Sequence, residues 1–111
     1  MDSNKIIAFP TSQGYQMIDS NDIEYIQSDG NYSKLFLIDT SMIHVNKTIS
    51  ALSKHLCPQN FIRTHHQYLV NKQCTTAYHK KDGQLILCSG KRIPVSVRKR
   101  KDTLNFFTIV T

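Results

Sequence analysis

The polar side chains best suited to chemistry fall within residues 61–72, "FIRTHHQYLVNK". This stretch contains Arg63, the adjacent His65 and His66, and Asn71 inside an otherwise apolar, strand-like run. Histidine is a common general base and metal ligand, whereas arginine and asparagine recognise phosphates and bases. These residues are therefore compatible with catalysis, metal binding, nucleic-acid recognition or a structural hydrogen-bonding role.

A catalytic role needs partners for the histidines. A general base must lie within reach of a nucleophile or an acid, in a pocket. The chain has a single glutamate, Glu24, while Asp29 and Asp82 precede turn glycines and Asp39 ends a strand-like segment. Paired carboxylates, a nucleophile elbow and a phosphate-cradling glycine loop are all missing from the sequence. We therefore predict that the protein is not an enzyme and needs no cofactor.

A metal site is disfavoured by the spacing of its candidate ligands. Neighbouring side chains of a strand face opposite ways, so His65 and His66 cannot easily bind one ion together. The three cysteines, Cys57, Cys74 and Cys88, are widely separated and form no CxxC pair. An odd count with this spacing argues against a zinc site and a disulfide framework. We predict no metal and three reduced, partly buried thiols.

The charge is distributed unevenly along the chain. Residues 1–62 hold four basic and six acidic residues, a net charge of −2, whereas residues 63–111 hold ten basic and two acidic residues, a net charge of +8. A concentrated basic surface on a small domain suggests a polyanionic partner, most often nucleic acid. A basic protein that is merely soluble is the alternative that charge alone leaves open.

Length and composition predict one soluble domain. A chain of 111 residues with 40% hydrophobic and 20% charged residues is typical of a single globular unit, with a core over about residues 5–107. Its apolar runs are far shorter than a membrane span, and no signal-peptide pattern begins the sequence. We expect a cytoplasmic protein with no membrane partner.

Turn signals divide the chain into short strands. Asp29-Gly30 and Asp82-Gly83 are strong hairpin signals, and Gly14 and Gly90 mark further turns. Tight connections of this kind imply antiparallel pairing. Strands are predicted at residues 5–11, 14–19, 23–28, 32–39, 42–47, 61–70, 75–81, 84–89 and 91–96.

One helix is expected between the two groups of strands. Ile49, Leu52 and Leu56 recur at helical spacing, Thr48 can cap the start and Pro58 marks the stop. Strands, one helix and strands again, without regular alternation, argue against a parallel α/β sheet.

A second helix is predicted over residues 96–107. Ser96 is a suitable N-cap, and Val97, Leu104 and Phe107 form a candidate buried stripe. The basic run at residues 98–101 lies at the helix start, where the partial positive charge of the helix disfavours cations. A bound phosphate would resolve this conflict, and Lys91 and Arg92 just upstream favour that interpretation. A solvated charge run is the alternative.

If residues 61–70 form a strand, each of its two faces carries both polar and apolar side chains. Residues 62, 64, 66, 68 and 70 share one direction and residues 61, 63, 65, 67 and 69 the other, and neither set is cleanly apolar. A strand that opens into a loop around residues 65–67 fits this pattern better than a continuous strand. One histidine would then hold the loop while the other projects outward.

Four blocks of the sequence resemble the LytTR family of bacterial DNA-binding domains. The family signature is similar to "FIRTHHQYLVNK", and three further blocks resemble it in the right order: "NDIEYIQSDGNYSKL", "TISALSKHL" and "GKRIPVSVRKRKDTL". The signature residues that match are Phe61, Arg63, His65, Tyr68, Leu69, Val70 and Asn71. The resemblance covers about residues 5–107.

The resemblance implies a mainly β fold of small packed antiparallel sheets, with one mid-domain helix and a short C-terminal helix. It also implies sequence-specific binding of double-stranded DNA by a transcriptional regulator, through loops and a helix start that read major grooves. The residues it places at the DNA are Asn31, Ser33, Lys34, His66 and Arg98, with Lys91, Arg92, Lys99 and Lys101 as phosphate contacts. Arg63, His65 and Asn71 would support the loop that presents His66.

The resemblance also carries expectations about partners. Relatives often bind direct repeats, which implies a monomer in solution or a DNA-dependent dimer, and many follow an upstream receiver domain. His66 and Gln67 depart from the arginine and serine that the family favours, so base preference at that position is left open. The alternatives are a β module that binds an acidic protein and a single-stranded nucleic-acid binder, although the latter usually needs exposed stacking aromatics.

Overall fold

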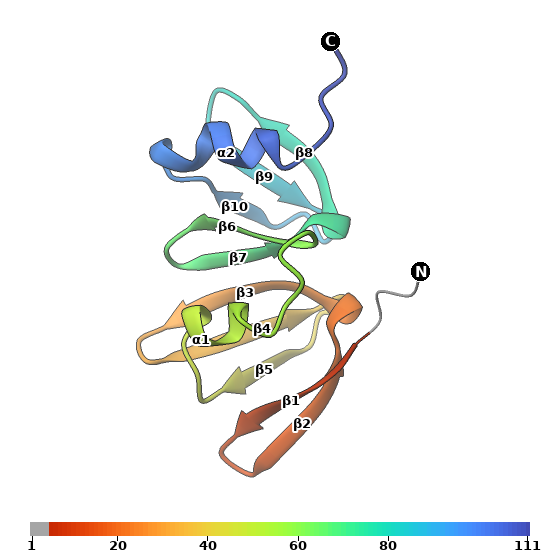
Figure 1. Cartoon of the computed structure of the whole chain (residues 1–111), viewed down its shortest axis with the longest axis vertical. Helices are drawn as coiled ribbons and strands as arrows, with labels where there is room; N and C mark the ends of the chain where they lie inside the picture. Colours follow the sequence, from red (N-terminus) through yellow and green to blue (C-terminus); the bar gives the residue numbers. More distant parts are fainter. Residues whose placement is uncertain (1–4) are drawn as a thin grey trace.

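The computed structural model describes residues 5–111, which form short antiparallel strands and two short α-helices (Figure 1). The predicted mainly β fold is therefore confirmed. The strands are β1 (Ile6–Thr11), β2 (Gly14–Asp19), β3 (Ile23–Asp29), β4 (Tyr32–Leu37), β5 (Met42–Val45), β6 (Phe61–His65), β7 (Tyr68–Asn71), β8 (Thr75–His79), β9 (Gln84–Leu87) and β10 (Arg92–Pro94). The helical elements are α1 (Ile49–Ser53), α2 (Arg100–Asn105) and the 3-10 turns η1 (Ser20–Asp22), η2 (Lys72–Cys74) and η3 (Val97–Lys99).

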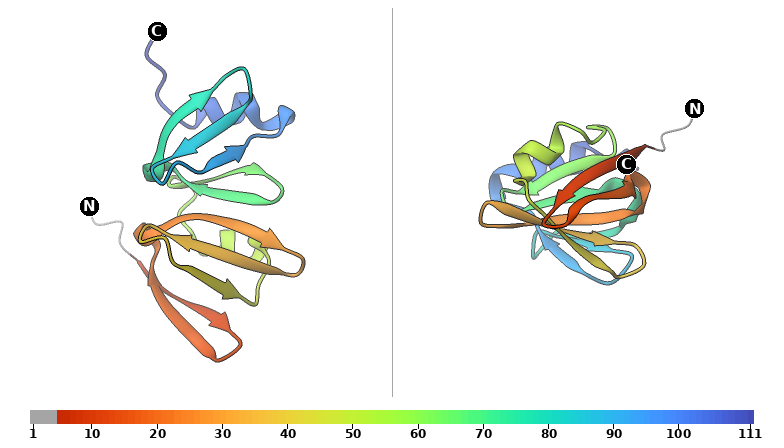
Figure 2. Two further views of the ribbon diagram at one scale, coloured as in Figure 1. Left: turned by 180° about the vertical axis from the view of Figure 1, so that it is seen from behind. Right: turned by 90° about the horizontal axis from the view of Figure 1, so that it is seen from below.

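The strands form three sheets stacked along the longest axis of the molecule (Figures 1 and 2). A five-stranded sheet with the order β5-β4-β3-β7-β6 lies between the β1-β2 pair and the β10-β9-β8 sheet. Its centre joins strands distant in sequence, because β3 pairs with both β4 and β7. The result is an elongated body of 47 × 35 × 24 Å.

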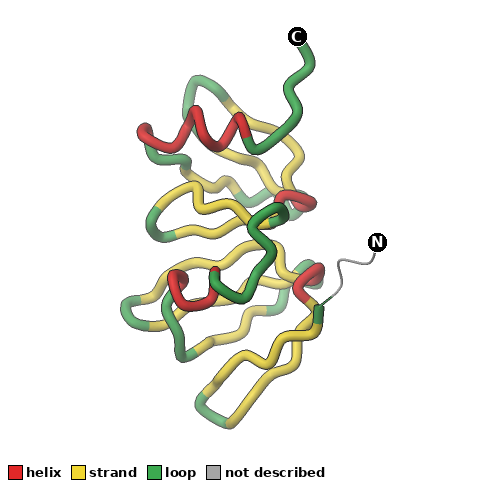
Figure 3. The backbone as a smooth tube through the Cα atoms, in the orientation of Figure 1, coloured by secondary structure: helices red, strands yellow, loops and turns green. Residues whose placement is uncertain are grey.

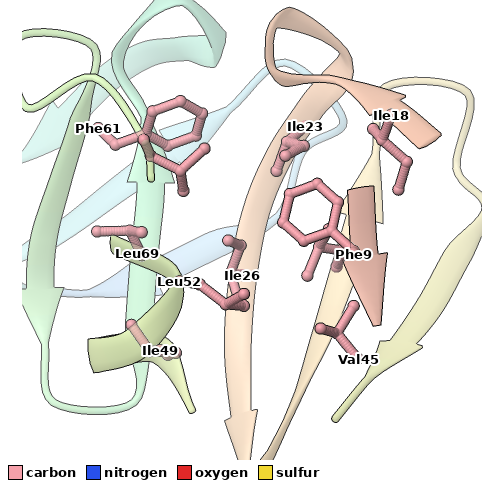
Figure 4. Packing of buried hydrophobic residues seen from close by; sticks show 11 residues of the cluster. Phe9, Ile18, Ile23, Ile26, Val45, Ile49, Leu52, Phe61 and Leu69 are labelled. Carbon is pink, nitrogen blue, oxygen red and sulfur yellow. The ribbon is translucent and has the colours of Figure 1, made fainter. Parts of the chain in front are cut away.

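Two hydrophobic cores hold the three layers together. Ile26 on β3 and Phe9 on β1 belong to the first core, which α1 also covers with Leu52 (Figure 4). Tyr25, the neighbour of Ile26, points the other way and packs with Leu85 and the third sheet. Since adjacent residues of a strand face opposite sides, β3 is buried on both faces and anchors both cores.

The predicted hairpin turns are present. The Asp-Gly pairs lie between β3 and β4 and between β8 and β9, and Gly30 and Gly83 adopt φ of 62° and 63°. This left-handed region carries little steric cost for glycine. The two turns therefore fix the register of their hairpins, as the sequence predicted.

The mid-domain helix also follows the prediction. Thr48 accepts a hydrogen bond from the Ala51 N–H at 3.2 Å, and Ile49, Leu52 and Leu56 are buried. The α-helix itself ends at Ser53, before the predicted stop at Pro58. Leu56 reaches the core from the following turn, where its N–H donates to the Ser53 carbonyl.

The C-terminal helix is shorter than predicted and begins differently. Residues 97–99 form η3 and only residues 100–105 are α-helical. Figure 3 shows the two together as one short helical stretch in red near the C-terminus. Ser96 holds the expected N-cap position, ahead of η3, but makes no side-chain capping bond. Val97 is 76% exposed, so the expected first residue of the buried stripe is wrong. Thr103 is the buried residue of this helix, with Leu104 and Phe107 partly covered.

Candidate nucleic-acid interface

Four connecting segments from different parts of the chain meet along one side of the molecule, here called the loop edge. They are the β3–β4 turn (residues 30–31), the β6–β7 loop (66–67), the β8–β9 turn (80–83) and the segment that enters α2 (96–99) (Figures 1 and 2). The edge runs along the longest axis, so these segments follow one another in a row.

Backbone hydrogen bonds fix the spacing of the loop edge. The Ser28 N–H donates to the Gln67 carbonyl at 2.9 Å and so ties the β6–β7 loop to the end of β3. Ser96 N–H donates to the Thr64 carbonyl at 2.9 Å, and Val95 N–H donates to the Gly83 carbonyl at 2.8 Å. Each loop is therefore attached to its neighbour by main-chain atoms rather than by mobile side chains.

Arg63 and His65 hold the β6–β7 loop from within. Arg63 donates from Nε to the His65 carbonyl at 3.0 Å and from Nη2 to the His66 carbonyl. The Gln67 N–H donates to His65 Nδ1 at 3.2 Å. Both side chains thus bond to backbone atoms of the loop.

The electrostatics of His65 suit this role. Desolvation lowers the pKa of the His65 imidazole, and the nearby His66 and Arg63 charges lower it further. A depressed pKa keeps the ring neutral, which leaves Nδ1 free to accept the Gln67 N–H. Desolvation also lowers the pKa of Arg63.

His66 stands at the tip of the same loop with an exposed side chain. Its ring stacks on the His65 ring, with centroids 4.6 Å apart and planes at 27°. The supported ring therefore acts as a platform for the exposed one. Strand alternation predicted that the two side chains face opposite ways, but in the loop their rings lie side by side.

The β3–β4 end of the loop edge differs in part from expectation. Asn31 is exposed in the turn and Lys34 is partly exposed on β4, opposite His44 of β5. Ser33, in contrast, is fully buried, and its hydroxyl donates to the Lys47 carbonyl at 2.7 Å. The Ser33 side chain braces the segment after β5 and is not available to a ligand.

The side chains of the basic run at residues 98–101 differ in their exposure: three reach solvent and one packs against the protein. Arg98 and Lys101 are exposed and Lys99 is partly exposed. Arg100 instead folds back, with its guanidinium against Gly83 and its Nε donating to the Val95 carbonyl at 3.4 Å. The run therefore presents Arg98 at the loop edge while Arg100 joins α2 to the β8–β9 turn.

Two of the predicted residues lie at the other ends of the strands. This opposite side, here called the corner edge, comprises η1, η2 and the β9–β10 turn (residues 88–91) (Figure 1). Lys91 lies there, with its ammonium 6.0 Å from the centre of the Tyr25 ring. Asn71 is buried there too and bonds to the Ile23 carbonyl at 2.9 Å, so it supports a corner and not the His66 loop.

Arg92 lies between the two edges, at the start of β10. Its Nη1 donates to Gln84 Oε1 at 3.4 Å, and Gln84 opens β9 beside the β8–β9 turn. The side chain is exposed and reaches toward the loop edge, in contrast to that of Lys91.

Sequence reasoning missed three lysines of the loop edge. Lys80 and Lys81 are exposed in the β8–β9 turn, and Lys47 is exposed beside the β3–β4 turn, where its carbonyl binds Ser33. The signal for the first two was present, because a Lys-Lys pair directly precedes the Asp82-Gly83 turn. Only the topology shows that this turn lies beside Arg98.

Other kinds of site find little support in the described part of the chain. Within residues 5–111, no three His, Cys, Asp or Glu side chains are placed to hold a metal ion. No helix in this range is long and apolar enough to cross a membrane. Cys74 is buried, while Cys57 and Cys88 are exposed.

Comparison with known proteins agrees with the geometry. The model of the LytTr DNA-binding domain family matches residues 13–107. The fold is similar to a solved LytTr DNA-binding domain of a methyl-accepting/DNA response regulator from Bacillus cereus, with a TM-score of 0.79 and 17% identity, covering 94% of this chain and 97% of that one. No curated protein matches the sequence. At this identity the structural likeness establishes the fold.

Proposed function

Because the chain belongs to the LytTR family of DNA-binding domains, we propose that it binds double-stranded DNA at specific sequences through its loop edge. The observation that carries the proposal is the gathering of exposed Asn31, His66 and Arg98 along one side, on loops fixed by main-chain bonds.

The order of the loops along the molecule suits contact with one duplex at several points. The loop edge follows the longest axis, with the β6–β7 loop between the β3–β4 turn and the α2 entry (Figure 1). We propose that these segments approach the major groove at different positions along the duplex.

The exposed residues fall into two classes by chemistry. Arg98 and His66 are our candidates for base contacts, since an arginine fork matches guanine O6 and N7, and a histidine N–H can donate to either acceptor. Asn31 can pair with adenine in the same way. Lys34, Lys47, Lys80, Lys81, Arg92, Lys99 and Lys101 are candidates for phosphate contacts, which position the protein without specifying sequence.

Binding of single-stranded nucleic acid has less support from the surface. Single-stranded binding needs exposed aromatic rings on which bases stack. Tyr32, 53% exposed on β4, is the large exposed aromatic closest in the chain to a loop-edge turn, whereas Tyr15 lies on the outer β1–β2 pair. A single ring favours a duplex ligand over an unpaired strand.

LytTR domains serve as output domains of response regulators, and we propose that this chain regulates transcription in the cytoplasm in that way. Control by a receiver domain and occupation of direct repeats by two copies are part of the same proposal. Pairing of copies would then depend on DNA, because the repeat spacing sets the distance between them.

Selection of bound duplexes from a random pool, followed by a salt titration, tests the proposal. We expect one enriched motif and a steep linear fall of log K with log salt, about −0.9 per neutralised phosphate on B-DNA. The same titration on the single strands is the control. Equal affinity for duplex and single strands, or no enrichment of any sequence, would contradict the proposal.

A further inference from the structure

Two of the three cysteines face each other at the corner edge. Cys74 ends η2 and Cys88 follows β9, and each lies one residue beyond the Thr75–Leu87 pair that ends the β8–β9 ladder, so the two lie opposite one another. The Cys88 N–H donates to the Cys74 carbonyl at 2.8 Å. Directly opposite residues of an antiparallel pair project from the same face of the sheet.

A buried carboxylate lies beside this pair of cysteines. Cys88 Sγ donates to Glu24 Oε2 at 3.7 Å, and the Ser89 N–H donates to the same oxygen at 3.0 Å. Burial raises the pKa of the Cys74 thiol to about 12, and the neighbouring Cys88 thiol and the Glu24 charge raise it further. Glu24 itself is only 3% exposed.

This geometry falls within the range that a disulfide requires. Opposite residues of an antiparallel pair have Cα atoms about 4.5–5.5 Å apart, and disulfides span about 4.4–6.8 Å between Cα atoms. We propose that Cys74 and Cys88 form a reversible intramolecular disulfide by exchange with a low-molecular-weight disulfide of the glutathione class. The inference does not rest on the proposed DNA binding.

The exchange takes place in two steps that balance. Exposed Cys88 attacks one sulfur of the small disulfide, forms a mixed disulfide and releases one small thiol. Cys74 Sγ then attacks Cys88 Sγ, closes the protein disulfide and releases the second small thiol. The protein loses two protons and two electrons, and the small disulfide gains them.

The exposure of the two cysteines sets the order of these steps. Cys88 is exposed and open to an external disulfide, whereas Cys74 is 4% exposed and reacts only with its neighbour. Because attack requires a thiolate, the raised pKa of Cys74 makes closure the slower step and predicts that it accelerates as pH rises. Cys57, exposed before β6 and not opposite another cysteine, serves as an internal reference thiol.

The test equilibrates the whole chain with mixtures of oxidised and reduced glutathione, then alkylates the free thiols under denaturing conditions and measures peptide masses. We expect a peptide pair that links residues 74 and 88 and one alkylated thiol at Cys57. The oxidised form should melt at least about 4 °C higher and return to its original melting temperature with dithiothreitol, because the bond constrains the unfolded chain.

Two variants make the outcome decisive. Cys57→Ser should keep the linked peptide and the melting shift. Cys88→Ser, a change at an exposed position, should lose both. The proposal is overturned if Cys88 in the unchanged protein stays as a mixed disulfide with glutathione, or if links form only between chains through Cys57.

Discussion

The loop edge and the corner edge lie at opposite ends of the same strands and treat their polar groups differently. The corner edge satisfies its polar side chains internally, whereas the loop edge leaves many of its cations exposed. This contrast indicates that the corners fix the fold and that the loops are available for a ligand.

The corners at η1 and η2 share the same hydrogen-bonding arrangement. Asp19 at the end of β2 accepts from the Asn21 N–H, and Asn71 at the end of β7 accepts from the Gln73 N–H, both at 2.9 Å. Each residue caps a 3-10 turn that leads directly into the next strand. Asn71 also donates to the Ile23 carbonyl, so the second corner is tied to the strand that leaves the first.

The loop edge relies on main-chain bonds and leaves polar groups without partners. Of the buried side-chain atoms without a hydrogen bond in residues 5–111, Thr64 Oγ1 and Ser96 Oγ flank the junction of β6 with the α2 entry. Local consistency is often lower at functional sites than in the rest of a protein. The loop edge fits that description better than the corner edge does.

The largest effect is expected from Asn71→Ala. The change removes two hydrogen bonds of a residue that is 2% exposed and leaves a buried carbonyl unpaired. We expect a loss of about 2–4 kcal/mol in the free energy of unfolding. Urea denaturation measures this loss, with Asn31→Ala as the matched control in an exposed turn. If the two variants have equal free energies of unfolding, Asn71 does not have the structural role that we assign to it.

Arg98→Ala should act on the ligand and not on the fold. Because the side chain is exposed in η3, stability should stay within about 0.5 kcal/mol of the unchanged protein. Binding to the selected duplex should weaken by about 1–3 kcal/mol, with relaxed preference at one base pair. Fluorescence anisotropy on selected and random duplexes measures both quantities. An equal loss on random DNA would make Arg98 a phosphate contact.

Variants of His65 and His66 test whether the first residue stabilises the β6–β7 loop and the second is exposed for the ligand. His65→Ala removes the acceptor for the Gln67 N–H and should cost about 1 kcal/mol of stability, whereas His66→Ala should cost less than about 0.5 kcal/mol. The lowered pKa of folded His65 predicts stability that is present above about pH 6.5 and lost as pH falls toward the folded value. Melting curves from pH 5 to 8 measure the stability loss of each variant and the pH dependence of the unchanged protein. The assignment fails if the two variants rank the other way.

The smallest effect concerns the lysines. Replacing Lys80 and Lys81 together by alanine should weaken binding to all duplexes alike and reduce the slope of log K against log salt by about 1 per lysine. Lys91→Ala at the corner edge is the matched control and should leave the slope unchanged. If Lys91→Ala changes the salt slope and the Lys80 and Lys81 double variant does not, the DNA binds at the corner edge, which contradicts our account.

Local signals in the sequence predicted the elements well. The two Asp-Gly turns, the Thr48 cap and the strand-to-loop change at residues 65–67 depend on neighbours in the chain, and all of them are present. Ser96 holds the N-cap position without a side-chain capping bond, and its N–H joins β6 through a bond to the Thr64 carbonyl. Such a bond between distant segments is invisible to a local pattern.

The site was predicted less completely because strand direction decides which edge a residue occupies. Lys91 and Arg98 are close in sequence, but β10 runs between them and carries them to opposite edges. The same reasoning explains Lys80 and Lys81, which reach the loop edge because β8 runs toward it. Ser33 was predicted to contact DNA, but strand alternation turns its side chain inward, where it is buried.

The central claim is that the loop edge, and not the corner edge, meets DNA. The most direct measurement is an amide NMR titration of the protein with its selected duplex. Our account predicts large shifts for residues 30–31, 65–67, 80–83 and 96–99, with small shifts for η1, η2 and residues 88–91. Large shifts confined to the corner edge, or spread evenly over both edges, would contradict the account.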